Sequence, residues 1–156
     1  MILMRILDVA CSADHQKAIV VLEDVEQRFR LTFSTDPHEA QRLAREMGRA
    51  RCACNPAYDF IESLLSAFQA AVSRVVLDDA EGKGIGALIY LRRAEAELSL
   101  PCYPPDALAL ALRAKVPIYA SATVLAHAQP LSGRGSVSPE PAEMRQWLEQ
   151  VKPEDF

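Results

Sequence analysis

The sequence has no long apolar run, few aromatic residues and no excess of basic charge. A membrane-spanning helix needs about 20 consecutive, mostly apolar residues, whereas the apolar start of this chain is interrupted by Arg5 and Asp8. A secretory signal needs an uninterrupted apolar stretch and a small-residue cleavage site, and neither is found here. We therefore expect a cytoplasmic protein with no membrane segment.

Cysteine is also scarce, with 4 residues at Cys11, Cys52, Cys54 and Cys102. Their spacing is unlike the disulfide framework of a small secreted domain. Cys52 and Cys54 form a close pair, but a structural zinc site normally has a second such pair. We therefore expect reduced, unliganded thiols.

The charge balance is acidic, with 17 Lys and Arg residues against 21 Asp and Glu residues and a net charge of −4. The molecule as a whole therefore has no field that attracts nucleic acid. The length of 156 residues and the hydrophobic content of 50% are sufficient for one globular domain with its own core.

Hydrophobic periodicity predicts an α+β fold. Alternating and β-branched segments predict strands at about 4–13, 19–22, 29–33, 74–78, 85–91, 97–100 and 117–120. Apolar residues three and four apart predict helices at about 37–47, 56–71, 104–113 and 121–127. The expected buried face of the second helix consists of Phe60, Ile61, Leu64, Leu65 and Phe68.

The strand-then-helix order occurs twice, and residues 31–44 align without a gap on residues 98–111. In this alignment Glu39 corresponds to Asp106, and Pro37 corresponds to Pro104. Any two strand–turn–helix units share Leu and Ala, which is the alternative explanation. We expect a pseudo-repeat over about 17–48 and 84–115, in which duplicated β-β-β-α units form a mixed or antiparallel sheet with helices packed on it.

The composition changes after residue 129. Residues 130–141 are rich in Gly, Pro and Ser, which is typical of a flexible linker between a domain at 1–129 and a tail at 142–156. Met144, Trp147, Leu148 and Val151 fall on one face of a predicted tail helix. We expect this helix to dock on its own domain or on a neighbouring subunit.

Three carboxylates stand near the starts of predicted helices: Glu39, Asp59 and Asp106. The helix macrodipole favours an acid at such a position, which is a sufficient structural reason for each of them. The alternative is that they gather around one cleft, where they bind a divalent cation or position a water molecule. His38 lies beside Glu39 and is a possible proton carrier.

Arg42 and Arg45 share one face of the first predicted helix and could contact phosphate groups. A solvated basic face is the more common meaning of such a pattern. The sequence contains no G-x-S-x-G nucleophile motif. The glycine-rich segment Gly82-Lys-Gly-Ile-Gly86 is not a phosphate-binding loop, because it leads into a predicted strand and not into a helix.

The segment Asp106-Ala-Leu-Ala-Leu-Ala-Leu-Arg113, followed by Ala114-Lys-Val-Pro-Ile-Tyr119, resembles the bifunctional nuclease domain family. That family has an R-P-S-D-A block, an apolar helix and a P-I-Y-V strand in this order. Glu39-Ala40 and Asp59 fall where the family has E-A and T-H-D-L, and the ending Val151-Lys-Pro-Glu-Asp-Phe156 resembles its P-E-D-F ending. The resemblance extends from about residue 4 to the end of the chain.

The resemblance implies an α+β domain that often self-associates and has nuclease activity on RNA and DNA. It implies metal-assisted hydrolysis, with Mg²⁺ or Mn²⁺ as possible ions, Asp106 and Asp59 as the best-placed acids, and Glu39 and His38 behind them. Arg42 and Arg45 would then bind the phosphate groups.

The chain also departs from the family pattern. Tyr103 and Pro105 replace the family's Arg and Ser, and Cys54 and Tyr58 replace an Arg and a His. Loss of these basic groups favours a second hypothesis, a non-catalytic oligomeric binding or regulatory protein with the same fold.

Overall fold

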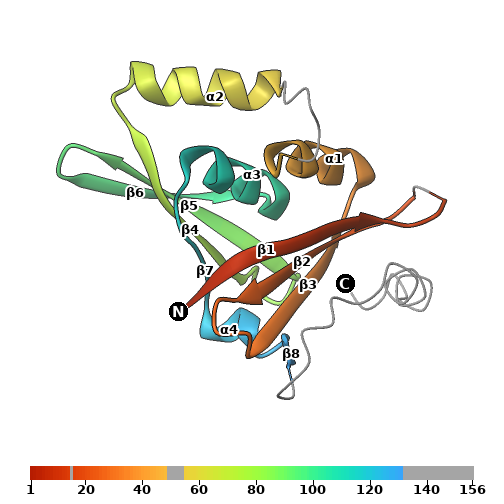
Figure 1. Cartoon of the computed structure of the whole chain (residues 1–156). Helices are drawn as coiled ribbons and strands as arrows, with labels where there is room; N and C mark the ends of the chain where they lie inside the picture. The colour runs from red at the N-terminus through yellow and green to blue at the C-terminus, as the bar shows by residue number, and fades with distance from the viewer. Residues whose placement is uncertain (15, 49–54, 132–156) are drawn as a thin grey trace.

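The computed structural model describes residues 1–14, 16–48 and 55–131 of the chain (Figure 1). The strands are β1 (Ile2–Cys11), β2 (Ala18–Asp24), β3 (Phe29–Thr35), β4 (Ala71–Asp79), β5 (Ile85–Arg93), β6 (Ala96–Cys102), β7 (Ile118–Ala120) and β8 (Gln129–Pro130). The helices are α1 (Pro37–Glu46), α2 (Pro56–Ala67), α3 (Pro104–Ala114) and α4 (Ala122–Leu125). The predicted linker beyond residue 131 and the predicted tail helix lie outside the described residues.

All the described strands belong to one mixed sheet with the order β6-β5-β4-β7-β1-β2-β3-β8. The meander β1-β2-β3 leads into α1, and the meander β4-β5-β6 is followed by α3. The short strand β7 lies between the two meanders, antiparallel to β1 and parallel to β4. This arrangement confirms the predicted α+β class and its two β-β-β-α units.

The two units also agree in strand register. Leu31 pairs with Leu22 in the first meander, and Leu98 pairs with Leu91 in the second. In β1 a bulge directly follows the residue paired with Leu22, and in β4 a bulge directly follows the residue paired with Leu91. A bulge bends and twists a strand, so both meanders are deformed at corresponding positions.

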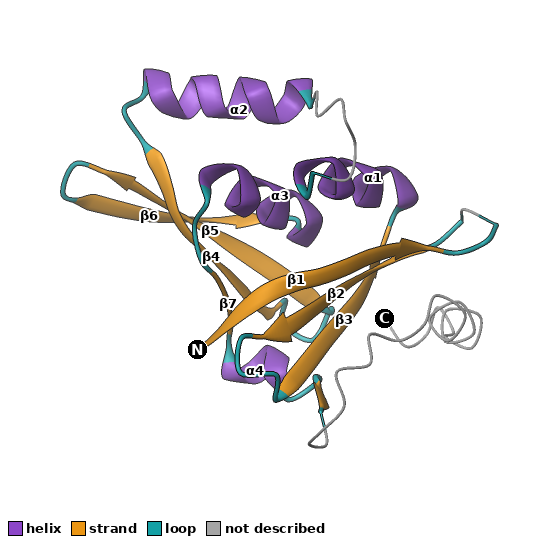
Figure 2. Cartoon of the chain, viewed as in Figure 1, coloured by secondary structure: helices purple, strands orange, loops and turns teal. Residues whose placement is uncertain are grey.

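Figure 2 shows α1, α2 and α3 gathered on one side of the sheet, with α4 away from them. The core between α1, α3 and the sheet contains Leu43 from α1, Leu108 from α3, and Leu22 and Leu77 from the strands, all fully buried. Asp36 caps α1 by accepting a hydrogen bond from the backbone N–H of His38. After α1, Gly48 adopts a left-handed φ of 76°, as its position in the sequence predicts.

The expected buried face of the second helix is wrong for three of its five residues. Phe60, Leu64 and Phe68 are exposed, whereas Ile61 packs on the core and the buried residue of the helix is Tyr58. The cause is the position of α2, which lies outside α1 and α3 rather than directly on the sheet (Figure 1). Only a narrow face of this helix therefore meets the rest of the domain.

The boundaries of α1 and α3 agree with the expectation to within one residue, whereas α2 stops at Ala67 and α4, expected at 121–127, ends at Leu125. Gln69 then takes a positive φ of 54°, and β4 begins at Ala71. The pairing of β8 with β3 was not predicted. Among residues 1–14, 16–48 and 55–131, no helix has the length and apolar character needed to cross a bilayer.

The turn between β2 and β3 is closed by Asp24, whose side chain is fully buried. Its carboxylate accepts hydrogen bonds from the backbone N–H groups of Arg28 at 2.6 Å and Phe29 at 2.7 Å. Burial acts to raise the pKa of Asp24, but these bonds to the ionised form outweigh it and lower the pKa below its usual 3.8.

We expect Asp24→Ala to lower the free energy of unfolding by about 2–3 kcal/mol, because two backbone N–H groups lose their charged, buried acceptor. The folded-state pKa is depressed, so the stabilisation by the carboxylate is present above about pH 4 and disappears as the pH falls through the folded value. Urea unfolding at several pH values should show that the difference in the free energy of unfolding between wild type and Asp24→Asn becomes smaller at acidic pH. Glu26→Ala, an exposed acid in the same turn, is the control, and an equal effect there would contradict the assignment.

Candidate functional site

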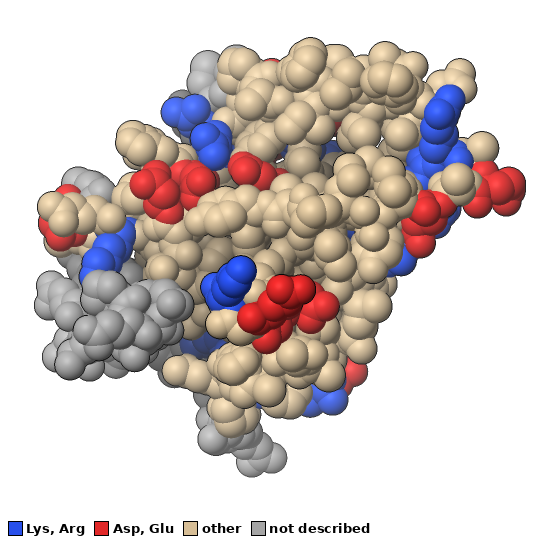
Figure 3. All heavy atoms as spheres, turned by 180° about the vertical axis from the view of Figure 1, so that it is seen from behind, with Lys and Arg blue, Asp and Glu red and all other residues tan. Residues whose placement is uncertain are grey.

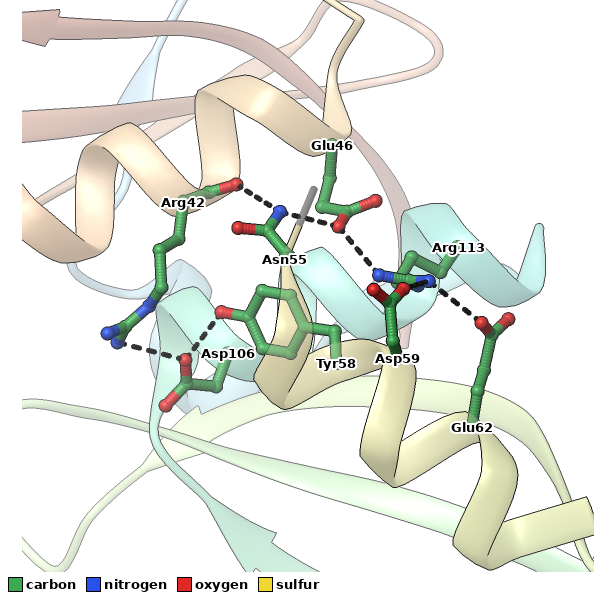
Figure 4. Close-up of polar contacts among 8 residues, drawn as sticks. All are labelled: Arg42, Glu46, Asn55, Tyr58, Asp59, Glu62, Asp106 and Arg113. Atoms are coloured by element: carbon green, nitrogen blue, oxygen red, sulfur yellow. Dashed lines mark hydrogen bonds and ion pairs between the residues drawn. The ribbon is translucent and has the colours of Figure 1, made fainter. Parts of the chain in front are cut away.

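Polar side chains from α1, α2 and α3 meet where the three helices come together (Figure 4). We call this group the three-helix cluster. Its members are Arg42 and Glu46 from α1, Asn55, Tyr58, Asp59 and Glu62 from the start of α2, and Asp106 and Arg113 from α3. The cluster has two ends, one around Asp106 and the other around Arg113.

At the first end, Asp106 lies in the first turn of α3, where the helix dipole favours a carboxylate. Its Oδ1 accepts a short hydrogen bond of 2.6 Å from the hydroxyl of Tyr58 and a longer contact of 3.4 Å from Nη2 of Arg42. The second carboxylate oxygen points away from both partners (Figure 4). The Asp106 side chain is 32% exposed and the Arg42 side chain 40% exposed, so both can be reached from solvent.

The electrostatics at this end keep Tyr58 protonated. Burial, reinforced by the hydrogen bond to the negative Asp106, raises the pKa of the Tyr58 hydroxyl well above its usual 10. Burial lowers the pKa of Arg42, but its interactions with Tyr58, Asp106 and Glu39 outweigh this and raise it. At neutral pH the Asp106 end therefore holds a neutral phenol that donates a hydrogen bond and a permanently charged guanidinium.

The Cys102 thiol, just before α3, is not activated. Burial and the nearby charge of Asp106 raise its pKa to about 11. Because the thiolate is the nucleophilic form, Cys102 is a poor nucleophile at neutral pH.

At the second end, Arg113 contacts three carboxylates. It bonds Glu46 at 3.1 Å, Glu62 at 2.8 Å and Asp59 by a short ion pair. Burial acts to lower the pKa of Arg113, but the hydrogen bonds with Asp59 and Glu62 outweigh it and raise the pKa. Asn55 also donates to Glu46 at 2.7 Å, so this end ties α1, α2 and α3 together.

The structure brings some of the candidate residues predicted from the sequence together and separates others. Arg42 and Asp106 are in direct contact, and the nearby Glu39 helps to raise the pKa of Arg42. Glu39 itself accepts a hydrogen bond of 2.8 Å from the hydroxyl of Thr35. Asp59 lies at the Arg113 end of the cluster. His38 and Arg45 are exposed on α1.

These positions do not suit a shared metal ion. Asp59 and Asp106 are engaged with different arginines. Within the part of the chain that the structure describes, no group of three or more His, Cys, Asp or Glu side chains is arranged to hold a metal. The divalent ion expected from the family resemblance therefore has no built site among these residues.

Tyr58 and Arg113 are central to the cluster but were not among the candidates. The signal for Tyr58 is its place where the family motif has a His. The signal for Arg113 is the repeat, because Arg113 and Glu46 are 67 residues apart and occupy corresponding positions of α3 and α1. Opposite charges at corresponding positions of two packed helices indicate an ion pair between them.

The fold and the cluster define an α+β protein with a polar site between three helices on one face of a mixed sheet. The family model described as the bifunctional nuclease domain matches residues 20–132. The chain therefore belongs to the bifunctional nuclease domain family, as its resemblance predicted. No curated protein matches the chain.

We expect Arg113→Met to lower the free energy of unfolding by about 2–3 kcal/mol, because it leaves the largely buried Glu46 without its cation. Arg113→Lys keeps the charge but loses the planar fork, so an intermediate loss is expected. Urea unfolding measures both variants, and Arg93→Met, at the exposed end of β5, is the matched control. A loss no larger than that of the control would contradict a bracing role for Arg113.

Proposed function

We propose that this protein acts on phosphodiester bonds of RNA or DNA, with Arg42, Tyr58 and Asp106 at the reacting centre. The observation that carries the proposal is the convergence of a partly exposed carboxylate, a guanidinium and a protonated phenol from three helices. Membership of the bifunctional nuclease domain family supports the same chemistry.

We propose one role for each group. The 3.4 Å contact between Arg42 and Asp106 is long, so the guanidinium can turn to a phosphate without losing a short hydrogen bond. The outward oxygen of Asp106 takes a proton from water as the water oxygen bonds to phosphorus, and the bond from phosphorus to the leaving sugar oxygen breaks. The leaving oxygen is then protonated from solvent.

In this scheme Tyr58 is a positioning residue. Its hydroxyl fixes the inner oxygen of Asp106 and, because its pKa is raised, continues to donate throughout the neutral range. The negative charge of Glu39 helps to raise the pKa of Arg42, and Glu39 takes no part in the proton transfer.

A second candidate function is a non-catalytic binding or regulatory protein. The observation that favours it is that Asp59, Asp106 and Glu39 each have a partner within the fold, so all three also serve as structural links. In addition, the face seen in Figure 3 carries basic and acidic residues in small, intermixed groups and not as one broad basic surface.

We further propose that the chain self-associates as a homo-oligomer and works in the cytoplasm with nucleic acid as its partner. Self-association is common to both candidate functions. The two candidates therefore differ in whether the chain cleaves the nucleic acid that it meets.

The test is cleavage of fluorescent single-stranded RNA and DNA by the full chain with Mg²⁺, with Mn²⁺ or with EDTA. We expect Asp106→Asn to lower the cleavage rate by about 10²-fold or more, the usual contribution of a general base. Tyr58→Phe should lower kcat with little change in KM, whereas Arg42→Met should mainly raise KM. Glu95→Gln removes an exposed carboxylate at the β5–β6 turn and is the control.

Thermal unfolding of each variant shows whether a loss of activity reflects a loss of fold. Equal rates for wild type and Asp106→Asn would exclude this cluster as the reacting centre. No cleavage by wild type in any of the three conditions, together with binding of labelled RNA, would establish the second candidate.

A further inference from the structure

The outer side of α2 carries three large apolar side chains that no part of the described chain covers. Phe60 is 67% exposed, Leu64 44% and Phe68 60%. We call these three residues the α2 stripe. They are spaced four residues apart, so they lie next to one another along one side of the helix and its last turn.

The rest of α2 leaves the stripe free of charge. Tyr58, Ile61 and Leu65 form the side of α2 that faces the domain. The acids Asp59 and Glu62 are both held by Arg113 within the chain. These two acids are the only charged residues of α2 and both are paired, so a second α2 could approach the stripe without bringing unpaired like charges together.

Two further large apolar side chains are exposed on β6, where Leu98 is 58% and Leu100 is 43% exposed. Leu98 pairs with Leu91, which packs on the core, so these side chains lie on the helix-bearing side of the sheet. Monomeric proteins rarely expose large apolar patches, and such patches generally mark interaction sites.

The order of residues in the α2 stripe points to a second copy of this chain as the occupant. Phe60 and Phe68 are equally distant from Leu64, so the stripe reads Phe–Leu–Phe in both directions. A twofold axis through Leu64 places each Phe60 against Phe68 of the other copy and Leu64 against Leu64. A self-complementary patch of this kind is what a symmetric dimer requires.

The edge of β6 is a weaker candidate for the contact. Pro101 lies within this edge strand and has no N–H to donate to another strand. Proline at an edge is a common device against strand addition. Side-chain packing between helices is therefore favoured over extension of the sheet.

We infer that two copies of this protein associate through antiparallel packing of their α2 stripes, with Leu64 on the twofold axis. The inference rests on the self-association proposed above and is independent of the phosphodiester chemistry. It names the surface that forms the dimer.

The first test is sedimentation velocity of the full chain over a wide range of concentration. A dimer is expected, and Leu64→Glu should raise its Kd by at least about 30-fold, the effect of losing a central hot-spot residue. The control is Val25→Glu, which places the same acid on another exposed apolar residue, 50% exposed in the β2–β3 turn. Because Leu64 is exposed, urea unfolding of Leu64→Glu should match that of wild type apart from the loss of dimer.

The second test is disulfide formation, with linkages identified by mass spectrometry of peptides so that native thiols are distinguished. Leu64→Cys should link to itself across the axis. Phe60→Cys alone should not, because its two copies lie about 12 Å apart along the antiparallel helices. A mixture of Phe60→Cys and Phe68→Cys should give the mixed linkage.

Three results would overturn the inference. A monomer at every concentration would remove both the dimer and the proposed self-association. A dimer that Leu64→Glu leaves intact and Leu64→Cys does not link would keep self-association and assign it to another surface. Self-linkage of Phe60→Cys, with no linkage between Phe60→Cys and Phe68→Cys in the mixture, would indicate a parallel arrangement of the two helices instead of an antiparallel one.

Discussion

The packing of α1 and α3 against each other and on the middle of the sheet is the constraint on which the rest of this structure depends. The two meanders are joined in the sheet through β7, a strand of 3 residues that pairs with both β1 and β4. Burial of Leu43 and Leu108 beneath the two helices adds the apolar contact that so short a strand cannot supply. Everything polar in the candidate site is built on this helix pair.

The three-helix cluster follows from that packing. Once α1 and α3 lie together, Arg42 meets Asp106 and Glu46 meets Arg113, and the start of α2 is bound to both pairs through Tyr58, Asp59 and Glu62. Partly buried charges are costly unless they are paired, so the cluster must be satisfied for the domain to be stable. The same requirement limits its chemistry, because a carboxylate that holds two helices together is less free to bind a metal ion.

The helix α2 belongs both to the polar cluster and to the exposed apolar surface. One side contributes a phenol and two acids to the cluster, and the other displays the apolar α2 stripe. Contact of the stripe with a second copy would bury the surface that the domain leaves exposed. The helix that positions Tyr58 on Asp106 would then also be the helix that forms the dimer.

Local patterns in the sequence determined the strands, the apolar helix α3 and the order of the two units. They also determined helix α1, which begins after its Asp36 cap and ends before Gly48. Local patterns suffice for these features because hydrophobic period, capping residues and turn residues act over a few positions. They also identified Asp106 and Arg42 as members of one candidate site. Only the tertiary structure decided that Asp59 joins Arg113 rather than Asp106, that Glu39 bonds Thr35, and that Phe60, Leu64 and Phe68 face outward. The reason is physical: helical period shows that a side is apolar, whereas the position of the helix in the fold decides which apolar side is covered.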